Sequence, residues 1–505
     1  MNLKENKRAN NIAVCLSALL VFIAVLKVNF ALAWVCYIPL FLVLINNKTK
    51  SLKYGLYFGL TLSVISFYWM IPGAQRFTGS SSVFGVIVFI ISSIILTAYW
   101  ILLFAVFRFF QRPIKKNTDV FINALVTAAI WVLGETLMAF VSLHMPWFLF
   151  KTGTAVSGNL YAIQPISFLG VNIASFVIVV VNYLFAYFII EKKYKQLFIP
   201  ASVFIVYMIL GYCMYISFKQ QSFLLKPIKA AVLTENIPPE MRWDDANGDA
   251  LVNRLLNLAK ESVALKPDIA VWSESTVPWT YRPDDDFVKE ILKITKPANI
   301  TQVIGINSDA DTAEVYNSVY SILPGGEVLG RYDKRYLLGF IEQPFAGVIF
   351  PFLSSAGFVV VPGTSSNAIE TPYGKAGILI CNESTVASAA ADVVNNNAQF
   401  ILNMSNDGWF SNTYIATQHF YNARLRAIET RKDLIVNSND GITGLIKASG
   451  EIASAQQRTE PHVSLETIQP NDFKTLQTSS PDIMLYVAGL ILVISFVAKL
   501  SVKKI

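Results

Sequence analysis

The sequence predicts a polytopic α-helical membrane domain of about eight spans, with an α/β domain inserted before the last span. Its 505 residues are 54% hydrophobic and only 15% charged, which is too apolar for an ordinary soluble protein of this size. The apolar residues fill positions 12–216 with few breaks and recur at 483–498. Between these stretches, strand-like runs alternate with helical ones, which is typical of an α/β layered domain.

The lengths of the apolar runs place the spans. A helix that crosses a bilayer needs about 20 apolar residues, within a range of roughly 17–25. Only Lys27 and Asn29 separate the first two candidates, which could instead be one long tilted helix. Basic residues before and after this pair favour two crossings, because basic residues concentrate on the cytoplasmic side. The predicted spans are residues 12–26, 28–45, 54–72, 84–107, 120–141, 166–190, 198–217 and 482–498.

Charge alternation predicts the orientation. Basic clusters at 108–116, 192–195 and 499–504 fall where alternation puts cytoplasmic loops, whereas the loops around Arg76 and Lys151 are poor in charge. Both termini are then cytoplasmic and the inserted domain lies outside. The net charge of +7 comes from these flanks and does not indicate nucleic-acid binding. The expected parts are a membrane domain with seven helices at 1–219, the inserted domain at 220–478, and a last helix with a short tail at 479–505.

The positions of the cysteines and histidines argue against a disulfide framework and against a metal site. Of four cysteines, Cys15, Cys36 and Cys213 lie far apart in apolar stretches, which does not fit a disulfide framework. The three histidines, at 144, 419 and 462, show no metal-ligand spacing. We therefore expect no metal and no cofactor. No cleavage site of small residues follows Leu26, so the first span is expected to be retained.

The inserted region reads as short apolar runs that end in polar residues. "ILPGGEV" and "KASGEIAS" are typical of hairpin turns, and "GDALVNRLLNLAKESVAL" and "TQHFYNARLRAIETRK" have helical spacing. The strand-like runs are "KAAVLTENI", "DIAVWSEST", "TQVIGINS", "SVYSILPGGEVLGRYDK", "GKAGILICNES", "AQFILNMSNDGWF" and "DLIVNSNDGITGLIKASGEI".

Three of these runs end in residues that could share one reaction. Cys381 follows "GILI", Glu274 follows "DIAVW" and Lys334 follows "EVLGRY". A carboxylate can take the proton of a thiol, and a nearby cation lowers the thiol pKa and stabilises an oxyanion. Each residue alone has an ordinary alternative: a small buried hydrophobe, a solvated turn residue and a surface charge. The prediction therefore depends on the combination.

In this order, the combination resembles the nitrilase superfamily, whose Glu-Lys-Cys triad stands on an αββα sandwich. "WSESTVPW" resembles its Trp-Pro-Glu segment and implies Glu274 as general base. "YDKRYLLGFIEQPF" implies Lys334 as the triad lysine and Glu342 as a further essential carboxylate. "CNES" implies Cys381 as nucleophile and Glu383 as its companion. The fold implied for the inserted domain is a nitrilase-like αββα sandwich.

The membrane context resembles one branch, the apolipoprotein N-acyltransferase family, over nearly the whole chain. "ENIPPEMRW" places Trp243 near substrate, and "HMPWFLF" resembles a Phe-Pro-Trp loop at Trp147. "NMSNDGWF", which contains Trp409, and "NSNDGITGLI" resemble two more segments. The three tryptophans could instead be interfacial anchors, a common role of tryptophan in membrane proteins.

The chain departs from the family pattern beside the triad. Asn382 stands where tyrosine is usual, and Ser273 replaces a proline before Glu274. Gly339 and Ile341 replace the usual proline and glycine near Glu342. These departures concern the acyl pocket and its loops, and the triad itself is intact.

The resemblance implies a two-step acyl transfer in a bacterial inner membrane, with the catalytic domain on the periplasmic side. Cys381 takes an acyl chain from a phospholipid as a thioester, and the α-amine of a diacylglyceryl-cysteine apolipoprotein receives it. The expected partners are thus phospholipid, apolipoprotein and membrane lipid, without nucleic acid; the sequence does not indicate an oligomeric state. A membrane-tethered amidohydrolase with the same triad is the alternative, with water as the acceptor. A non-catalytic module or transporter is the third reading, although the spans hold few ionisable residues besides Glu135 and Lys27.

Overall fold

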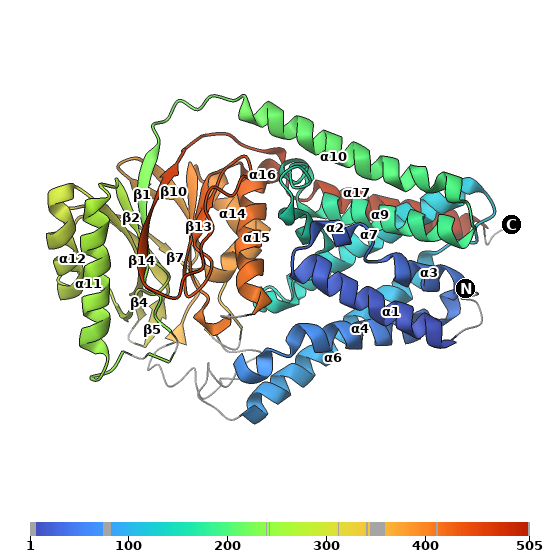
Figure 1. Cartoon of the computed structure of the whole chain (residues 1–505), viewed down its shortest axis with the longest axis horizontal. Coiled ribbons are helices and arrows are strands. Elements are labelled where there is room, and N and C mark those ends of the chain that lie inside the picture. Colours follow the sequence, from blue (N-terminus) through green and yellow to red (C-terminus); the bar gives the residue numbers. More distant parts are fainter. Residues whose placement is uncertain are drawn as a thin grey trace.

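The computed structural model describes residues 7–73, 82–238, 240–241, 243–311, 313–339, 342–343, 359–410 and 413–502. Arg76 and Ile341, named above, lie outside these residues, as do Lys503 and Lys504 of the last basic cluster. Two parts lie side by side (Figure 1): a bundle of helices and an α/β part. The α/β part follows helix α10 (Phe198–Lys219) and precedes helix α17 (Ile483–Val502), so it is an insertion before the last apolar helix, as predicted.

All eight predicted spans contain helix, and within the described ranges six helices are long and apolar enough to cross a membrane. The second predicted span is shorter and broken, because α2 (Phe30–Ala33) and α3 (Ile38–Asn46) are separate; α4 (Ser51–Phe67) is also short. The sixth begins later than predicted, since Gly170 has φ 67° and separates α8 (Ile166–Leu169) from α9. The six are Lys7–Leu26 (α1 and a π-helical turn), Ser82–Phe110 (α6), Asn117–Val141 (α7), Val171–Ile190 (α9), Tyr194–Lys219 (with α10) and Ile483–Ser501 (α17).

The first two spans are separate segments, as the charge pattern predicts, and α3 packs back against α1. The bundle is held by close backbone contacts as well as apolar packing. A side chain at Gly55 or Gly59 of α4 would begin 2.8 Å from the Cα of Ile101 or 2.7 Å from that of Thr97, both on α6. Small residues at such crossings let two helices approach closely where no hydrophobic effect drives them together.

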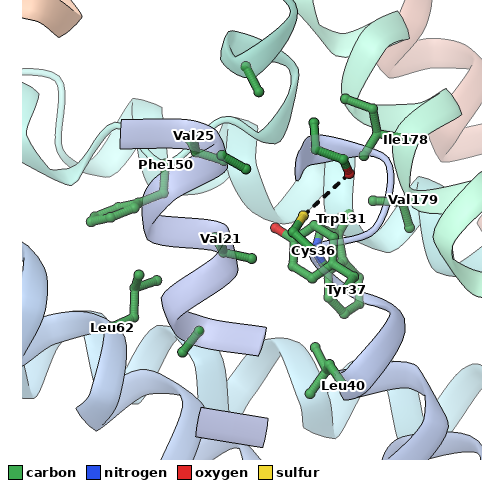
Figure 2. Close-up of a cluster of buried hydrophobic side chains, with 14 of the residues drawn as sticks. Val21, Val25, Cys36, Tyr37, Leu40, Leu62, Trp131, Phe150, Ile178 and Val179 are labelled. Carbon is green, nitrogen blue, oxygen red and sulfur yellow. Dashed lines mark hydrogen bonds between the residues drawn. The ribbon is translucent and has the colours of Figure 1, made fainter. Parts of the chain in front are cut away.

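Cys36, which lies in one of the apolar stretches of the sequence, is a residue of the bundle core. Figure 2 shows its side chain among Val21, Tyr37, Leu40 and Trp131, and it is fully buried. Its thiol donates a hydrogen bond to the Ala33 carbonyl oxygen at 3.4 Å, which satisfies the polar group locally.

The α/β part consists of two sheets. Among the described residues, the first sheet has nine strands in the order β14-β1-β2-β4-β5-β8; β3 and β6 also pair with β4, and β7 pairs with β6. The second has five, in the order β13-β12-β11-β10-β9. Parallel strands form the centre of each, β1-β2-β4 and β10-β11-β12, which suits their continuous apolar runs because both faces are covered.

Every predicted strand-like run contains a strand. The first sheet comprises β1 (Ile228–Thr234), β2 (Ile269–Val271), β3 (Val277–Thr280), β4 (Thr301–Asp311), β5 (Glu314–Tyr316), β6 (Ser318–Ile322), β7 (Val328–Asp333), β8 (Val359–Val360) and β14 (His462–Ile468). The second comprises β9 (Ile369–Thr371), β10 (Gly374–Ile380), β11 (Phe400–Asn406), β12 (Leu434–Asn439) and β13 (Gly444–Ile446). The strands β3, β5, β8 and β9, with two to four residues each, are too short to stand out in the sequence. β14, with seven residues, is also not among the predicted strand-like runs.

The layers confirm the αββα order. Ile228 and Val232 of β1 share one buried cluster with Ile378 and Ile380 of β10, so the sheets pack face to face. The outer face of the first sheet is covered by α11 (Gly248–Ala264) and α12 (Asp286–Thr295). On the other side, α14 (Ala387–Asn395) and α15 (Tyr414–Thr430) cover the second sheet (Figure 1).

Helix α15 lies between the second sheet and the helical bundle (Figure 1), and nearly every residue in it is buried. Gln418 Nε2 donates to the Val25 carbonyl oxygen at 2.8 Å, and the Tyr414 hydroxyl donates to that of Ser66 at 3.0 Å. Polar side chains on this helix thus bond to backbone in the bundle, which fastens the two parts together.

Candidate functional site

The ends of neighbouring strands bring the predicted site residues together. Lys334 directly follows β7, Cys381 directly follows β10, and Glu274 lies three residues after β2. Strands β2 and β7 belong to the first sheet and β10 belongs to the second, so the site lies where the two sheets meet. The side chains of all three residues are buried, with exposed fractions of 1%, 4% and 8% for Lys334, Cys381 and Glu274.

Lys334 is the centre of a charged cluster. Its Nζ lies 3.0 Å from Glu274 Oε1 and 2.9 Å from Glu342 Oε1. Burial alone would lower the pKa of Lys334, but the charges of Glu274 and Glu342 raise it well above the usual value. The ammonium therefore stays protonated, and a fixed cation in a water-poor site is what an oxyanion requires.

Asn317, which the sequence analysis does not single out, completes this cluster. Its Nδ2 donates to Glu274 Oε1 at 2.9 Å and to Glu342 Oε1 at 3.3 Å, and its carbonyl oxygen accepts from the Lys334 N–H at 2.8 Å. The residue lies between β5 and β6. The only signal in the sequence is an asparagine that interrupts the alternating run "EVYNSVY".

Cys381 occupies a strained turn between strand and helix. It has φ 53°, in the left-handed region that costs a non-glycine residue roughly 1–3 kcal/mol, and it opens the 3-10 turn Cys381–Thr385. Strain of this kind persists where surrounding contacts over-determine the backbone, and Glu383 supplies them.

Glu383 ties the thiol-bearing turn to the lysine-bearing loop. Its Oε2 accepts from the Ile380 N–H at 2.8 Å, and its Oε1 accepts from the N–H groups of Arg335 at 2.8 Å and Tyr336 at 3.2 Å. Tyr332 donates to both oxygens at 3.0 Å. Burial raises the pKa of Glu383, although the backbone donors act in the opposite direction. Glu383 is thus a positioning residue, two places from the thiol.

The departures from the family pattern have defined contacts. Asn382 Nδ2 donates to the Tyr336 carbonyl oxygen at 2.9 Å, while its Oδ1 is buried and has no partner among the described residues. The Gly339 N–H donates to the His144 carbonyl oxygen at 2.8 Å. The loop that carries Lys334 and Glu342 is therefore held by the segment that follows α7 in the bundle.

The thiol of Cys381 carries its proton in this environment. Burial is the largest influence and raises the pKa of Cys381 well above the usual value; the charge of Glu274 raises it further. Lys334 lowers it, as expected from the sequence, but is outweighed. A base must therefore take the proton as the sulfur attacks.

A cavity of about 270 Å³ borders the site, and Glu274 is one of its lining residues. Its walls combine the residues after β1 and β2 with Asn406 and Asn439, which end β11 and β12. Trp243, predicted near substrate, lines it and packs edge-on against Trp279 with ring centroids 5.3 Å apart. Its other lining residues are Glu235, Ile237, Pro238, Met241, Ser273, Ser275, Thr276 and Pro278.

Of the other two predicted tryptophans, Trp147 is not among the described residues that line this cavity. Trp147 lies in the turn Pro146–Phe148 and packs against the core of the helical bundle. Trp409 lies in the turn Gly408–Phe410, and its side chain is outside the described part of the structure. Within the described ranges, His, Cys, Asp and Glu side chains form no group of three or more that could hold a metal ion.

Comparison with known proteins gives two family matches. Residues 229–477 match the family described as Carbon-nitrogen hydrolase, and residues 17–184 match the Apolipoprotein N-acyltransferase N-terminal domain. The first match covers the α/β part described above, and the second covers most of the helices that precede it.

Curated relatives align along most of their length. Apolipoprotein N-acyltransferase of Geobacter metallireducens is 26% identical over 440 residues, 83% of this chain and 82% of the relative. The protein of that name from Wigglesworthia glossinidia brevipalpis is 25% identical over 81% of each chain. That of Vibrio parahaemolyticus is 24% identical over 86% of each. With both parts of the chain matched in the same order, this protein belongs to the apolipoprotein N-acyltransferase family, a membrane-embedded branch of the carbon-nitrogen hydrolases.

Proposed function

We propose that this protein is an apolipoprotein N-acyltransferase that moves a fatty acyl chain from a phospholipid, through a thioester on Cys381, to the α-amine of an N-terminal diacylglyceryl-cysteine. One observation carries the proposal: a buried Glu274–Lys334–Glu342 cluster beside a strained cysteine, in a domain fastened to helices of membrane length. No cofactor is required, because every step is a nucleophilic substitution at a carbonyl carbon.

The first half-reaction forms the thioester. Glu274 takes the proton of Cys381 as the sulfur attacks the ester carbonyl carbon of the phospholipid. Lys334 stabilises the oxyanion, together with a backbone N–H after the nucleophile. The tetrahedral intermediate collapses with cleavage of the carbon–oxygen bond. The lysophospholipid alkoxide leaves and takes the proton back from Glu274.

The second half-reaction forms the amide. The acceptor α-amine gives a proton to Glu274 and its nitrogen attacks the thioester carbonyl. The carbon–sulfur bond breaks, the sulfur regains a proton and the N-acyl product leaves. Glu342 keeps Lys334 in place in both steps, since its other oxygen accepts from the Leu338 N–H at 2.7 Å.

Water as the acceptor would make the protein an amidohydrolase, and the same triad serves both reactions. The attached helices favour lipid-borne substrates, because both the donor and the acceptor keep their acyl chains in a bilayer. α6, α10 and α17 expose large apolar side chains along their length, as lipid-facing helices do.

The proposed reaction is tested by following a labelled acyl chain. Purified protein is incubated with phospholipid labelled in its acyl chain, quenched in acid and analysed for a labelled Cys381 peptide. We expect a thioester that hydroxylamine removes. A diacylglyceryl-cysteine peptide should then convert the label into an amide that resists hydroxylamine. Release as free fatty acid, unchanged by the peptide, would establish the amidohydrolase instead.

We also propose the orientation and the domain limits: a membrane domain at 1–219, a catalytic domain at 220–478 on the periplasmic side of the inner membrane, and a last helix with a cytoplasmic tail at 479–505. The start of α1 and the end of α17 lie at the same end of the bundle, away from the α/β part (Figure 1), which supports a common side for both termini. The basic residues Lys192, Lys193 and Lys195 follow α9.

This orientation predicts a pattern of labelling in intact spheroplasts. A cysteine at Asn367, which is exposed, should react with a membrane-impermeant thiol reagent. A cysteine at Lys192, also exposed, should react only after the membrane is permeabilised. Both are introduced into a chain whose Cys213 is replaced by alanine, because that thiol is exposed. The opposite pattern would place the catalytic domain in the cytoplasm.

A further inference from the structure

The cavity beside Glu274 contains a second acidic residue that the mechanism above does not use. Glu235 directly follows β1, lines the cavity and is only 1% exposed. Its Oε1 accepts hydrogen bonds from the Ser273 N–H at 3.0 Å and the Thr276 hydroxyl at 3.5 Å. Its Oε2 is buried and has no hydrogen-bond partner among the described residues.

The way Glu235 is held is connected to a departure from the family pattern. Its strongest contact is the N–H of Ser273, which replaces a proline in the Trp-Pro-Glu segment. Proline has no N–H and could not make this bond. The backbone hydrogen bond that holds the carboxyl group at position 235 is therefore possible only because residue 273 is not proline.

A buried carboxyl oxygen without a partner is costly, so its retention needs a reason. Burial raises the pKa of Glu235, and the bonds from Ser273 and Thr276 act in the opposite direction. A cation that entered the cavity would favour the ionised carboxylate and supply the missing partner. The neighbouring carboxylate Glu274 differs in this respect, because Lys334 and Asn317 already occupy its Oε1.

We propose that Glu235 binds the protonated α-amine of the acceptor polypeptide in the cavity beside Glu274. The inference rests on the proposed acyl transfer and specifies how the second substrate is recognised. A terminal α-amine has a pKa of about 7.7–8.0, so the acceptor arrives mostly as an ammonium ion. The Oε2 of Glu235 accepts a hydrogen bond from this ion, and the apolar walls of Ile237, Met241 and Trp243 surround the carbon atoms next to it.

The position also suits the chemistry that follows. Glu274 lines the same cavity and lies close enough to Cys381 to raise the pKa of its thiol. An ammonium held by Glu235 can therefore give one proton to Glu274 before its nitrogen attacks the thioester. Nitrogen–carbon bond formation and carbon–sulfur cleavage then follow, and Glu274 returns its proton to the sulfur. The second proton that the nitrogen loses as the amide forms passes to the carboxylate of Glu235 and from there to solvent.

A purely structural role is the competing explanation. Glu235 also braces the segment from Ser273 to Thr276, in which Ser275 has φ 49°. Glutamine at position 235 keeps an oxygen that accepts both of these bonds but removes the negative charge. Alanine removes the brace and the charge together. The two substitutions therefore separate binding of a cation from support of the turn.

The experiment measures the half-reactions separately in the full-length protein. Cys381 is first loaded from labelled phospholipid, and the thioester is then discharged with increasing concentrations of a diacylglyceryl-cysteine peptide. For Glu235→Gln we expect the half-saturating peptide concentration to rise at least about tenfold, the effect of losing one charge-assisted hydrogen bond. Discharge by hydroxylamine, a small neutral nucleophile, should stay at the wild-type rate. Glu370→Gln, which changes an exposed partner of Lys375, is the matched control.

The remaining outcomes are decisive. Unchanged peptide dependence in Glu235→Gln would overturn ammonium binding, as would an equal loss of both half-reactions. Normal behaviour of Glu235→Gln with loss of loading in Glu235→Ala would assign a bracing role instead. Failure of the wild-type protein to form a thioester, or to pass it to the peptide, would contradict the proposed acyl transfer and not this subsite.

Discussion

We expect Cys381→Ser to abolish acyl transfer, with a loss on the order of 10⁴-fold or more. In the wild-type protein, burial and the charge of Glu274 raise the pKa of the Cys381 thiol, so removal of its proton already limits the nucleophilic attack. A serine hydroxyl holds its proton far more tightly than a thiol, and a carboxylate is too weak a base to take it. The measurement is the rate of N-acylation of a diacylglyceryl-cysteine peptide in detergent micelles.

Cys213→Ala and Cys15→Ala are the controls for this substitution. Cys213 is exposed on α10 and Cys15 is partly buried in α1, and neither lies in the charged cluster. Both variants should keep the wild-type rate. A Cys381→Ser protein that retained most of its activity would show that the acyl chain never passes through position 381.

The second large effect is expected from Lys334→Met. The substitution leaves Glu274 and Glu342 buried without their cation, and breaking a buried pair in this way typically costs about 3–5 kcal/mol. Loss of an oxyanion donor costs about 10²–10³ in rate, and more when the donor is charged. Thermal unfolding and the acylation rate should therefore both change, whereas Lys375→Met, at an exposed ion pair, should change neither.

The pH dependence of alkylation separates this role from that of Glu274. Lys334 lowers the pKa of Cys381 and Glu274 raises it. Lys334→Met should therefore move the alkylation midpoint of Cys381 with a small neutral reagent to higher pH. Glu274→Gln should move it to lower pH, although the enzyme is inactive because its base is gone. If both substitutions moved the alkylation midpoint in the same direction, Lys334 and Glu274 would not have opposite electrostatic effects on the Cys381 thiol.

Much of the fold follows from patterns that act over short distances. Continuous apolar runs predict the helices of the bundle, and strand-like runs predict β1, β4, β10, β11 and β12. Span ends are less predictable, because they depend on local capping. The Asn29 side chain accepts from the Leu32 N–H at 3.1 Å and starts α2 at Phe30, whereas the predicted span starts at residue 28.

The site residues that could be predicted are reactive side chains that come just after an apolar, strand-like run. Glu274, Lys334 and Cys381 each follow an apolar run, and the structure brings the first two within 3.0 Å. Asn317 and Glu235 were not predictable, because no neighbouring motif marks the residues 43 and 38 positions away that they contact. An asparagine or glutamate in a loop looks the same in the sequence whether it faces water or a buried carboxylate.

Helix α15 has a consequence for the evolution and engineering of this architecture. On one side, Arg426 Nη1 donates to the Thr385 carbonyl oxygen at 3.3 Å, within the turn that Cys381 opens. On the other, Arg431 Nη2 donates to Gln164 at 2.8 Å, a residue of the bundle. If the α/β part were produced without the bundle, Arg431 would lose its partner Gln164. The α/β part is therefore not an independent catalytic domain that could be moved to another membrane anchor. Substitutions on one side of α15 must be matched by substitutions on the other.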